Sequence, residues 1–88
     1  MRPLFVFVKC VLTETYRVAE AIVDTIPQTA EIFSVSGDWD ILCRFNLEED
    51  RDIGRFVTET VQAIPGVRET STLVGFRLFS GRDTLGAG

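Results

Sequence analysis

The residues best suited to chemistry lie in one short stretch, Ser36-Gly37-Asp38-Trp39-Asp40, between two apolar runs. Two carboxylates and an indole surround a single glycine. Backbone N–H groups beside a glycine can approach an anion without obstruction from a Cβ atom. A carboxylate such as Asp40 can pair with an ammonium group. This combination suits a small zwitterion that presents a carboxylate and an ammonium close together.

The same residues also have purely structural interpretations. Gly37 and Asp38 are ordinary turn formers. Trp39, next to a turn, is typical of a packing or interface anchor, and Asp40 at a strand start either bonds local backbone groups or contacts a ligand. Arg44 either holds an acidic group of a ligand or pairs with an aspartate of a second subunit.

The side-chain inventory argues against most catalytic chemistry. There is no histidine, which is the commonest general base and metal ligand, so we expect no metal, no other cofactor and no Ser-His-Asp catalysis. Cys10 and Cys43 lie in apolar runs without a CxxC motif, so buried thiols are expected rather than a disulfide. The chain is therefore not expected to be an enzyme.

Size and charge narrow the class of protein further. The chain has 88 residues, enough for one domain, with nine basic and thirteen acidic side chains and a net charge of −4. An acidic chain is poorly suited to direct nucleic-acid binding, because phosphate neutralisation needs a basic surface. No stretch approaches the roughly 20 apolar residues of a membrane span, and no signal-peptide cleavage site is evident. We expect a cytoplasmic protein without a membrane partner.

The apolar patterns predict six elements in the order βαββαβ. Two helical patterns separate strand-like runs rich in β-branched and aromatic residues. The expected strands are Leu4–Leu12, Glu31–Ser36, Asp40–Leu47 and Val67–Phe79. One expected helix starts in Thr13-Glu14-Thr15 and is stopped by Pro27, and the other covers Ile53–Ile64. This order predicts an α+β, ferredoxin-like fold with a four-stranded antiparallel sheet and both helices on one face. The domain is expected over residues 1–80, followed by a mobile, glycine-rich tail at residues 81–88.

An internal repeat supports this order. A shift of 38 residues aligns Leu4 with Leu42, and Ile26-Pro27 with Ile64-Pro65. The shift is even, so it should preserve which side of a strand each residue faces. The repeat alone does not decide which face of the first strand meets the helices.

The first strand is apolar on both faces, since Leu4, Val6 and Val8 alternate with Phe5 and Phe7. An antiparallel sheet with one wet face should instead alternate apolar and polar residues. Leaving the phenylalanines in water would cost about 1.5–3 kcal/mol each. A second copy of the chain is the simplest cover, so we expect a homodimer through the open sheet face.

Two motifs resemble a known family when taken together. They are Val35-Ser36-Gly37-Asp38-Trp39-Asp40 before an apolar strand, and Pro65-Gly66-Val67 followed by Thr70-Ser71-Thr72. Over about residues 4–79 the chain resembles the effector-binding domain of Lrp/AsnC-type regulators, also called RAM for regulation of amino-acid metabolism. That family usually carries a helix-turn-helix before this domain. Here the first strand begins within five residues of Met1, so we expect a stand-alone form.

The resemblance implies a dimeric α/β barrel, in which the sheets of two subunits pack face to face and dimers often assemble into octamer-like rings. It implies amino-acid effectors in clefts between subunits, a role in transcription regulation, and a full-length regulator of the same family as a partner. The residues implied to line the effector cleft are Ser36, Gly37, Asp38, Trp39, Asp40, Thr70 and Thr72. Two alternatives remain: a cofactor-free enzyme on the same dimeric fold, and a purely structural oligomerisation domain.

Overall fold

The computed structural model describes residues 1–79, so the predicted domain end at residue 80 and the predicted tail at residues 81–88 lie outside the described part. The order βαββαβ and the ferredoxin-like fold are confirmed. The second helix is a short α-helical turn that continues as a π-helical turn. The elements are β1 (Arg2–Cys10), α1 (Thr15–Thr25), β2 (Thr29–Ser34), β3 (Ile41–Leu47), α2 (Ile53–Phe56), η1 (Val57–Val61) and β4 (Val67–Val74).

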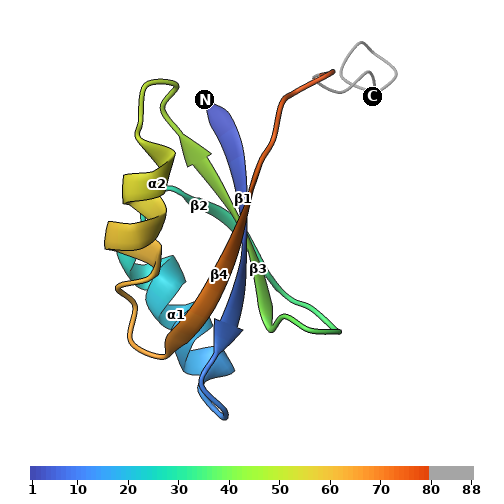
Figure 1. The fold of residues 1–88 in the computed structure, drawn as a ribbon, viewed down its shortest axis with the longest axis vertical. Helices are drawn as coiled ribbons and strands as arrows, with labels where there is room; N and C mark the ends of the chain where they lie inside the picture. The colour runs from blue at the N-terminus through green and yellow to red at the C-terminus, as the bar shows by residue number, and fades with distance from the viewer. Residues whose placement is uncertain (80–88) are drawn as a thin grey trace.

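The four strands form one antiparallel sheet in the order β2-β3-β1-β4. The helices lie on the same side of this sheet, and the hairpin between β2 and β3 projects at one end (Figure 1). The central strands β1 and β3 supply the buried strand residues of the core, while β2 and β4 form the two edges. One sheet face is therefore covered by helices and the other is bare.

The helix-covered face of β1 carries Leu4, Val6, Val8 and Cys10, all of which are buried. This answers the question that the sequence left open. The remaining core comes from β3 and the two helices, with Phe45 and Phe56 in edge-to-face contact at 5.1 Å between ring centroids. Its members are Ile41, Cys43, Phe45, Leu47, Val18, Ile22, Ile26, Phe56, Val57 and Val61.

The opposite face, called the open face below, carries both apolar and charged side chains. Phe33 and Leu73 are about half exposed there, at 48% and 54%. Phe5, Phe7 and Leu42 are partly covered by their neighbours. By strand register the open face comprises Phe5, Phe7 and Lys9 of β1, Leu42 and Arg44 of β3, Glu31 and Phe33 of β2, and Glu69, Ser71 and Leu73 of β4.

The internal repeat needs a correction. The even shift aligns Leu4 with Leu42, yet Leu4 is buried under the helices and Leu42 lies on the open face. The structural counterpart of Leu4 is Ile41, one residue earlier. The loop between β3 and α2 is one residue longer than the loop between β1 and α1, so a single shift cannot fit both strands and helices.

The last strand is shorter than expected. It ends at Val74, not at Phe79, and residues 76–79 leave the sheet. Gly75 donates a final backbone hydrogen bond to Pro3 at 3.0 Å. A Cβ atom at Gly75 would lie 3.0 Å from Pro3 Cγ and from Phe5 Cε2, so glycine allows the chain to leave β4 in close contact with β1.

Within residues 1–79, no helix is long and apolar enough to cross a membrane.

Candidate functional site

The predicted site lies in the loop that joins β2 to β3. Its base is fixed by backbone bonds from Val35 N to Asp40 O, 3.1 Å, and from Asp40 N to Val8 O, 3.0 Å. The Asp40 carboxylate also accepts a hydrogen bond from the backbone N–H of Cys10 at 2.8 Å. The Asp40 carboxylate therefore makes a local hydrogen bond, which is one of the two interpretations of this residue.

The tip of the loop is open. Gly37 has φ +97°, and no atom lies within 4 Å of the place where its Cβ would be. Among residues 1–79, the N–H groups of Gly37 and Asp38 have no hydrogen-bond acceptor. Ser36 and Asp38 are exposed. Two backbone donors and one carboxylate therefore face solvent around a glycine.

Trp39 connects this loop to the open face of the sheet. Its ring centroid lies 5.9 Å from that of Phe7, and the Lys9 ammonium lies 5.8 Å from the centre of the Trp39 ring. Lys9 stands opposite Glu69 in the β1–β4 register. The interpretation of Trp39 as an anchor fits this packing.

The two predicted threonines lie elsewhere in the single chain. Thr70 is opposite Val8, and Thr72 is opposite Val6, so both belong to the helix-covered side of the sheet. The Thr70 hydroxyl accepts a hydrogen bond from Gln62 Nε2 at 2.8 Å. Within one copy, the structure brings Ser36 to Asp40 together but places Thr70 and Thr72 on the other face from Trp39.

Phe7 and Lys9 are the neighbours of Trp39 that sequence reasoning missed. Their place beside the indole follows from the register of β1 against β3, which the incorrect repeat alignment obscured. The alternation of Val6, Val8 and Cys10 against Phe7 and Lys9 is the signal that could have identified them, once the helix-facing side was known.

Arg44 pairs within its own chain. Its guanidinium lies 2.7 Å from Glu31 Oε1 across the β2–β3 register, so within one copy Arg44 has a carboxylate partner of its own chain. Beside it a groove of about 270 Å³ is lined by Pro3, Phe5, Arg44, Gly75, Phe76 and Arg77. This groove lies at the far end of β1 from Trp39.

Neither cysteine is suited to nucleophilic chemistry. Burial raises the pKa of the Cys10 thiol, and the neighbouring Asp40 carboxylate raises it further, against a smaller opposing effect of a hydrogen bond with Thr15. Burial, with a contribution from Cys10, raises the pKa of Cys43 to about 12. Both thiols stay protonated at neutral pH, and the thiolate is the reactive form. Residues 1–79 contain no cluster of three or more His, Cys, Asp or Glu side chains that could hold a metal ion.

Solved structures share this fold. A protein from Thermus thermophilus is 30% identical and superposes with a TM-score of 0.73, over 92% of this chain and 100% of that one. A transcriptional regulator from Neisseria meningitidis, solved as an L-Met complex, superposes with a TM-score of 0.76 over 91% of this chain and 53% of the regulator. At 17% identity this second likeness shows the fold alone.

Sequence relatives are regulators. An uncharacterised HTH-type transcriptional regulator from Pyrococcus furiosus is 39% identical over 51 residues, which are 58% of this chain and 34% of the relative. A similar regulator from Pyrococcus abyssi is 35% identical over 60 residues, which are 68% of this chain and 39% of the relative. The chain thus spans little more than a third of these curated relatives.

The family model described as the Lrp/AsnC ligand binding domain matches residues 4–83, nearly the whole chain. The fold, the loop motif and this match agree, and the chain belongs to the Lrp/AsnC ligand binding domain family.

Proposed function

We propose that this chain is an oligomeric effector-binding module that takes a free amino acid and acts in transcription regulation, without catalysis. The observation that carries this proposal is the open tip of the β2–β3 loop. The N–H groups of Gly37 and Asp38 are available to a carboxylate, and the exposed Asp38 side chain is available to an ammonium group. An amino acid presents a carboxylate and an ammonium group close together.

The second part of the proposal is a homodimer through the open face. Phe33 and Leu73 are half exposed beside Phe5, Phe7 and Leu42, an apolar patch of the kind that marks an interface. Trp39 lies at the border between this patch and the loop, so the ligand cleft lies at the seam between copies. Thr70 and Thr72 lie on the helix side of their own sheet and face away from this seam, so the proposed cleft is lined by residues from Ser36 to Asp40 and not by these threonines.

A regulator of the same family is the proposed protein partner, joined through the same interface. The match to the ligand-binding domain and the HTH-type regulators among its relatives support this role. The neighbouring structure that was solved with L-Met supports the amino-acid class of ligand. Larger rings of dimers and a cytoplasmic location belong to the same proposal.

A thermal-shift panel of the twenty amino acids tests the function. A ligand at one hundred times its Kd should add about 2.7 kcal/mol of stability. Asp38→Asn should abolish the shift while leaving the melting temperature of the ligand-free protein unchanged, because Asp38 is exposed. The matched control Asp24→Asn, exposed on α1, should keep the full shift.

The other outcomes separate the alternatives. No shift with any amino acid favours a structural oligomerisation domain, and turnover of a bound compound favours an enzyme. A stable 9.8 kDa monomer in dilute buffer would contradict the dimer. Phe7→Asp should convert a dimer to a monomer of unchanged fold.

A further inference from the structure

We propose that Lys9 binds the carboxylate of the effector at the tip of the β2–β3 loop and restricts the site to ligands with a free carboxylate. The proposal rests on the amino-acid module proposed above and adds a residue of β1 to the residues of the loop. Lys9 thereby discriminates between two classes of small ligand: amino acids, and amines that carry an ammonium group without an acid.

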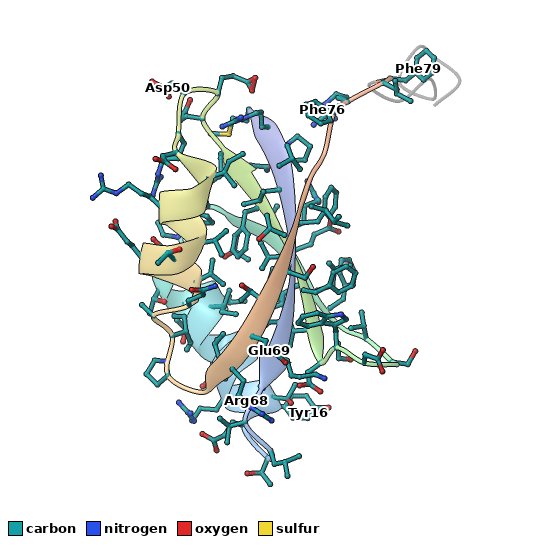
Figure 2. The ribbon with its side chains drawn as sticks, in the orientation of Figure 1. Tyr16, Asp50, Arg68, Glu69, Phe76 and Phe79 are labelled. Atoms are coloured by element: carbon teal, nitrogen blue, oxygen red, sulfur yellow. The ribbon has the colours of Figure 1, made fainter. Side chains whose placement is uncertain are left out.

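The surroundings of the loop are negatively charged, which opposes the binding of an acid. Asp38 is exposed at the tip, and Asp40 lies at the base. Figure 2 shows Glu69 on β4, at the end of the sheet where the β2–β3 hairpin projects. A ligand carboxylate in this place is repelled by these groups, and the N–H groups of Gly37 and Asp38 are neutral dipoles. We therefore expect a nearby cation to be required.

Backbone hydrogen bonds hold Lys9 beside this loop. The N–H of Asp40 donates to Val8 O at 3.0 Å, and the N–H of Cys10 donates to the Asp40 carboxylate at 2.8 Å. These two bonds lie on either side of Lys9, so the base of the loop is fixed next to it. Alternate residues of a strand face opposite sides. Because Val8 and Cys10 are buried under the helices, the Lys9 side chain stands on the open face.

The Lys9 ammonium lies close to the loop and has no carboxylate partner in the described part of the chain. It is 5.8 Å from the centre of the Trp39 ring, and Trp39 directly follows Asp38. Within residues 1–79 Lys9 forms no ion pair, although Glu69 stands opposite it in the β1–β4 register. A cation above an aromatic face is attracted by the ring but keeps its charge. The ammonium therefore remains available to an anion.

The loop tip is within reach of this ammonium. Gly37 is two residues from Trp39, which is at most about 7 Å along the backbone. Lysine carries its charge on a flexible aliphatic stem, so the ammonium can move from the indole to a carboxylate at Gly37. Among residues 1–79, Arg44 is the other basic residue that the register places on the open face, but its guanidinium is paired with Glu31.

Paired probes that differ only in the carboxylate test the proposal on the full chain. They are the twenty amino acids of the thermal-shift panel and their α-amides, which keep the side chain and the ammonium group but lack the acid. Titration calorimetry then gives the dissociation constants of each pair that stabilises the protein. The parent should bind the amide more weakly than the amino acid by about tenfold or more. An amide that binds the parent as tightly as its amino acid, or more tightly, would overturn the proposal without any variant.

Two substitutions separate the charge of Lys9 from its packing. Lys9→Met keeps an aliphatic stem beside Trp39 and should weaken binding of the amino acid by about tenfold or more, while the amide binds as well as before. Lys9→Arg keeps the charge and should bind the amino acid more tightly than Lys9→Met does. Arg55→Met is the matched control, because it removes one exposed positive charge from the helix layer, and it should bind the amino acid as the parent does.

The results distinguish this proposal from the function on which it rests. A Lys9→Met protein that binds the amino acid with the affinity of the parent, or that loses acid and amide equally, overturns the role of Lys9 and keeps the effector-binding module. Equal affinities of Lys9→Met and Lys9→Arg do the same, because the charge then has no effect. A parent protein that no amino acid and no amide stabilises overturns both proposals.

Discussion

The Asp40 carboxylate accepts a hydrogen bond from the backbone N–H of Cys10 at 2.8 Å, which fastens the β2–β3 loop to the end of β1. The loop that carries the open donors of Gly37 and Asp38 is therefore held at its base and free at its tip. This division gives Asp40 a structural role and leaves Asp38 as the carboxylate that faces solvent.

Asp40→Ala should lower the free energy of unfolding by about 1–3 kcal/mol, because the N–H of Cys10 loses its acceptor at a partly buried position. Urea denaturation followed by the fluorescence of Trp39, the single tryptophan, measures this change. Asp38→Ala is the control and should stay within about 0.5 kcal/mol of the parent. Equal effects of the two substitutions would contradict the division of roles.

Alanine substitutions at Gly66 and Gly37 offer a second comparison between two similar positions. Both have positive φ, +98° and +97°, but a Cβ at Gly66 would lie 2.8 Å from Val18 Cγ2, while the space at Gly37 is empty. Gly37→Ala should cost about 1–2 kcal/mol of backbone strain. Gly66→Ala should cost about 1–3 kcal/mol more, since Val18 is fully buried and cannot move aside.

Thermal or urea unfolding of the two alanine variants gives the comparison. Arg17 also lies 3.0 Å from the Cβ position at Gly66, but as an exposed, flexible side chain it can shift. Arg17→Ala combined with Gly66→Ala should therefore recover little of the loss. A large recovery would mean that the arginine, not Val18, makes the contact that matters.

Cys43 should make stability fall at alkaline pH. The unfolded thiol loses its proton near its ordinary pKa of 9.0, while the folded thiol keeps it to about 12. Between these values the folded state binds more protons, so the free energy of unfolding decreases by up to about 1.4 kcal/mol per pH unit as pH rises. Below pH 9 the contribution is constant.

The measurement compares the parent with Cys43→Ala from pH 7 to pH 10.5 under reducing conditions. The alanine variant lacks this linkage, so the stability difference between the two proteins should be largest below pH 9 and shrink above it. Other titrating groups are common to both proteins and cancel. A difference that is independent of pH would show that the Cys43 pKa is not raised.

The sequence predicted the order of elements because periodicity and turn residues are local signals. It placed the ends of strands less well, because the end of β4 lies against Pro3 and Phe5, which are far away in the chain. It also mispaired the repeat, because one extra loop residue changes which side of a strand each residue faces.

The site was predictable in part for the same reason. Ser36 to Asp40 are consecutive, so a turn necessarily brings them together. The positions of Thr70 and Thr72 relative to Trp39 depend on the register of β4 against β1, which the sequence motif does not encode. The contacts of Trp39 with Phe7 and Lys9 depend on long-range pairing in the same way.

Alanine substitutions at Phe45 and at Phe33 should affect different properties: the first the stability of the fold, the second the affinity of the dimer. Phe45 is fully buried under the helices, whereas Phe33 is 48% exposed on the open face. Phe45→Ala should lower the free energy of unfolding by about 3–5 kcal/mol. Phe33→Ala should cost much less stability but weaken the dimer at least tenfold, about 1.4 kcal/mol, because its ring is buried only when a second copy covers it. Urea denaturation measures the free energy of unfolding, and sedimentation equilibrium at matched concentration measures the dimer dissociation constant. A dimer unaffected by Phe33→Ala would place the interface away from the β2 side of the open face.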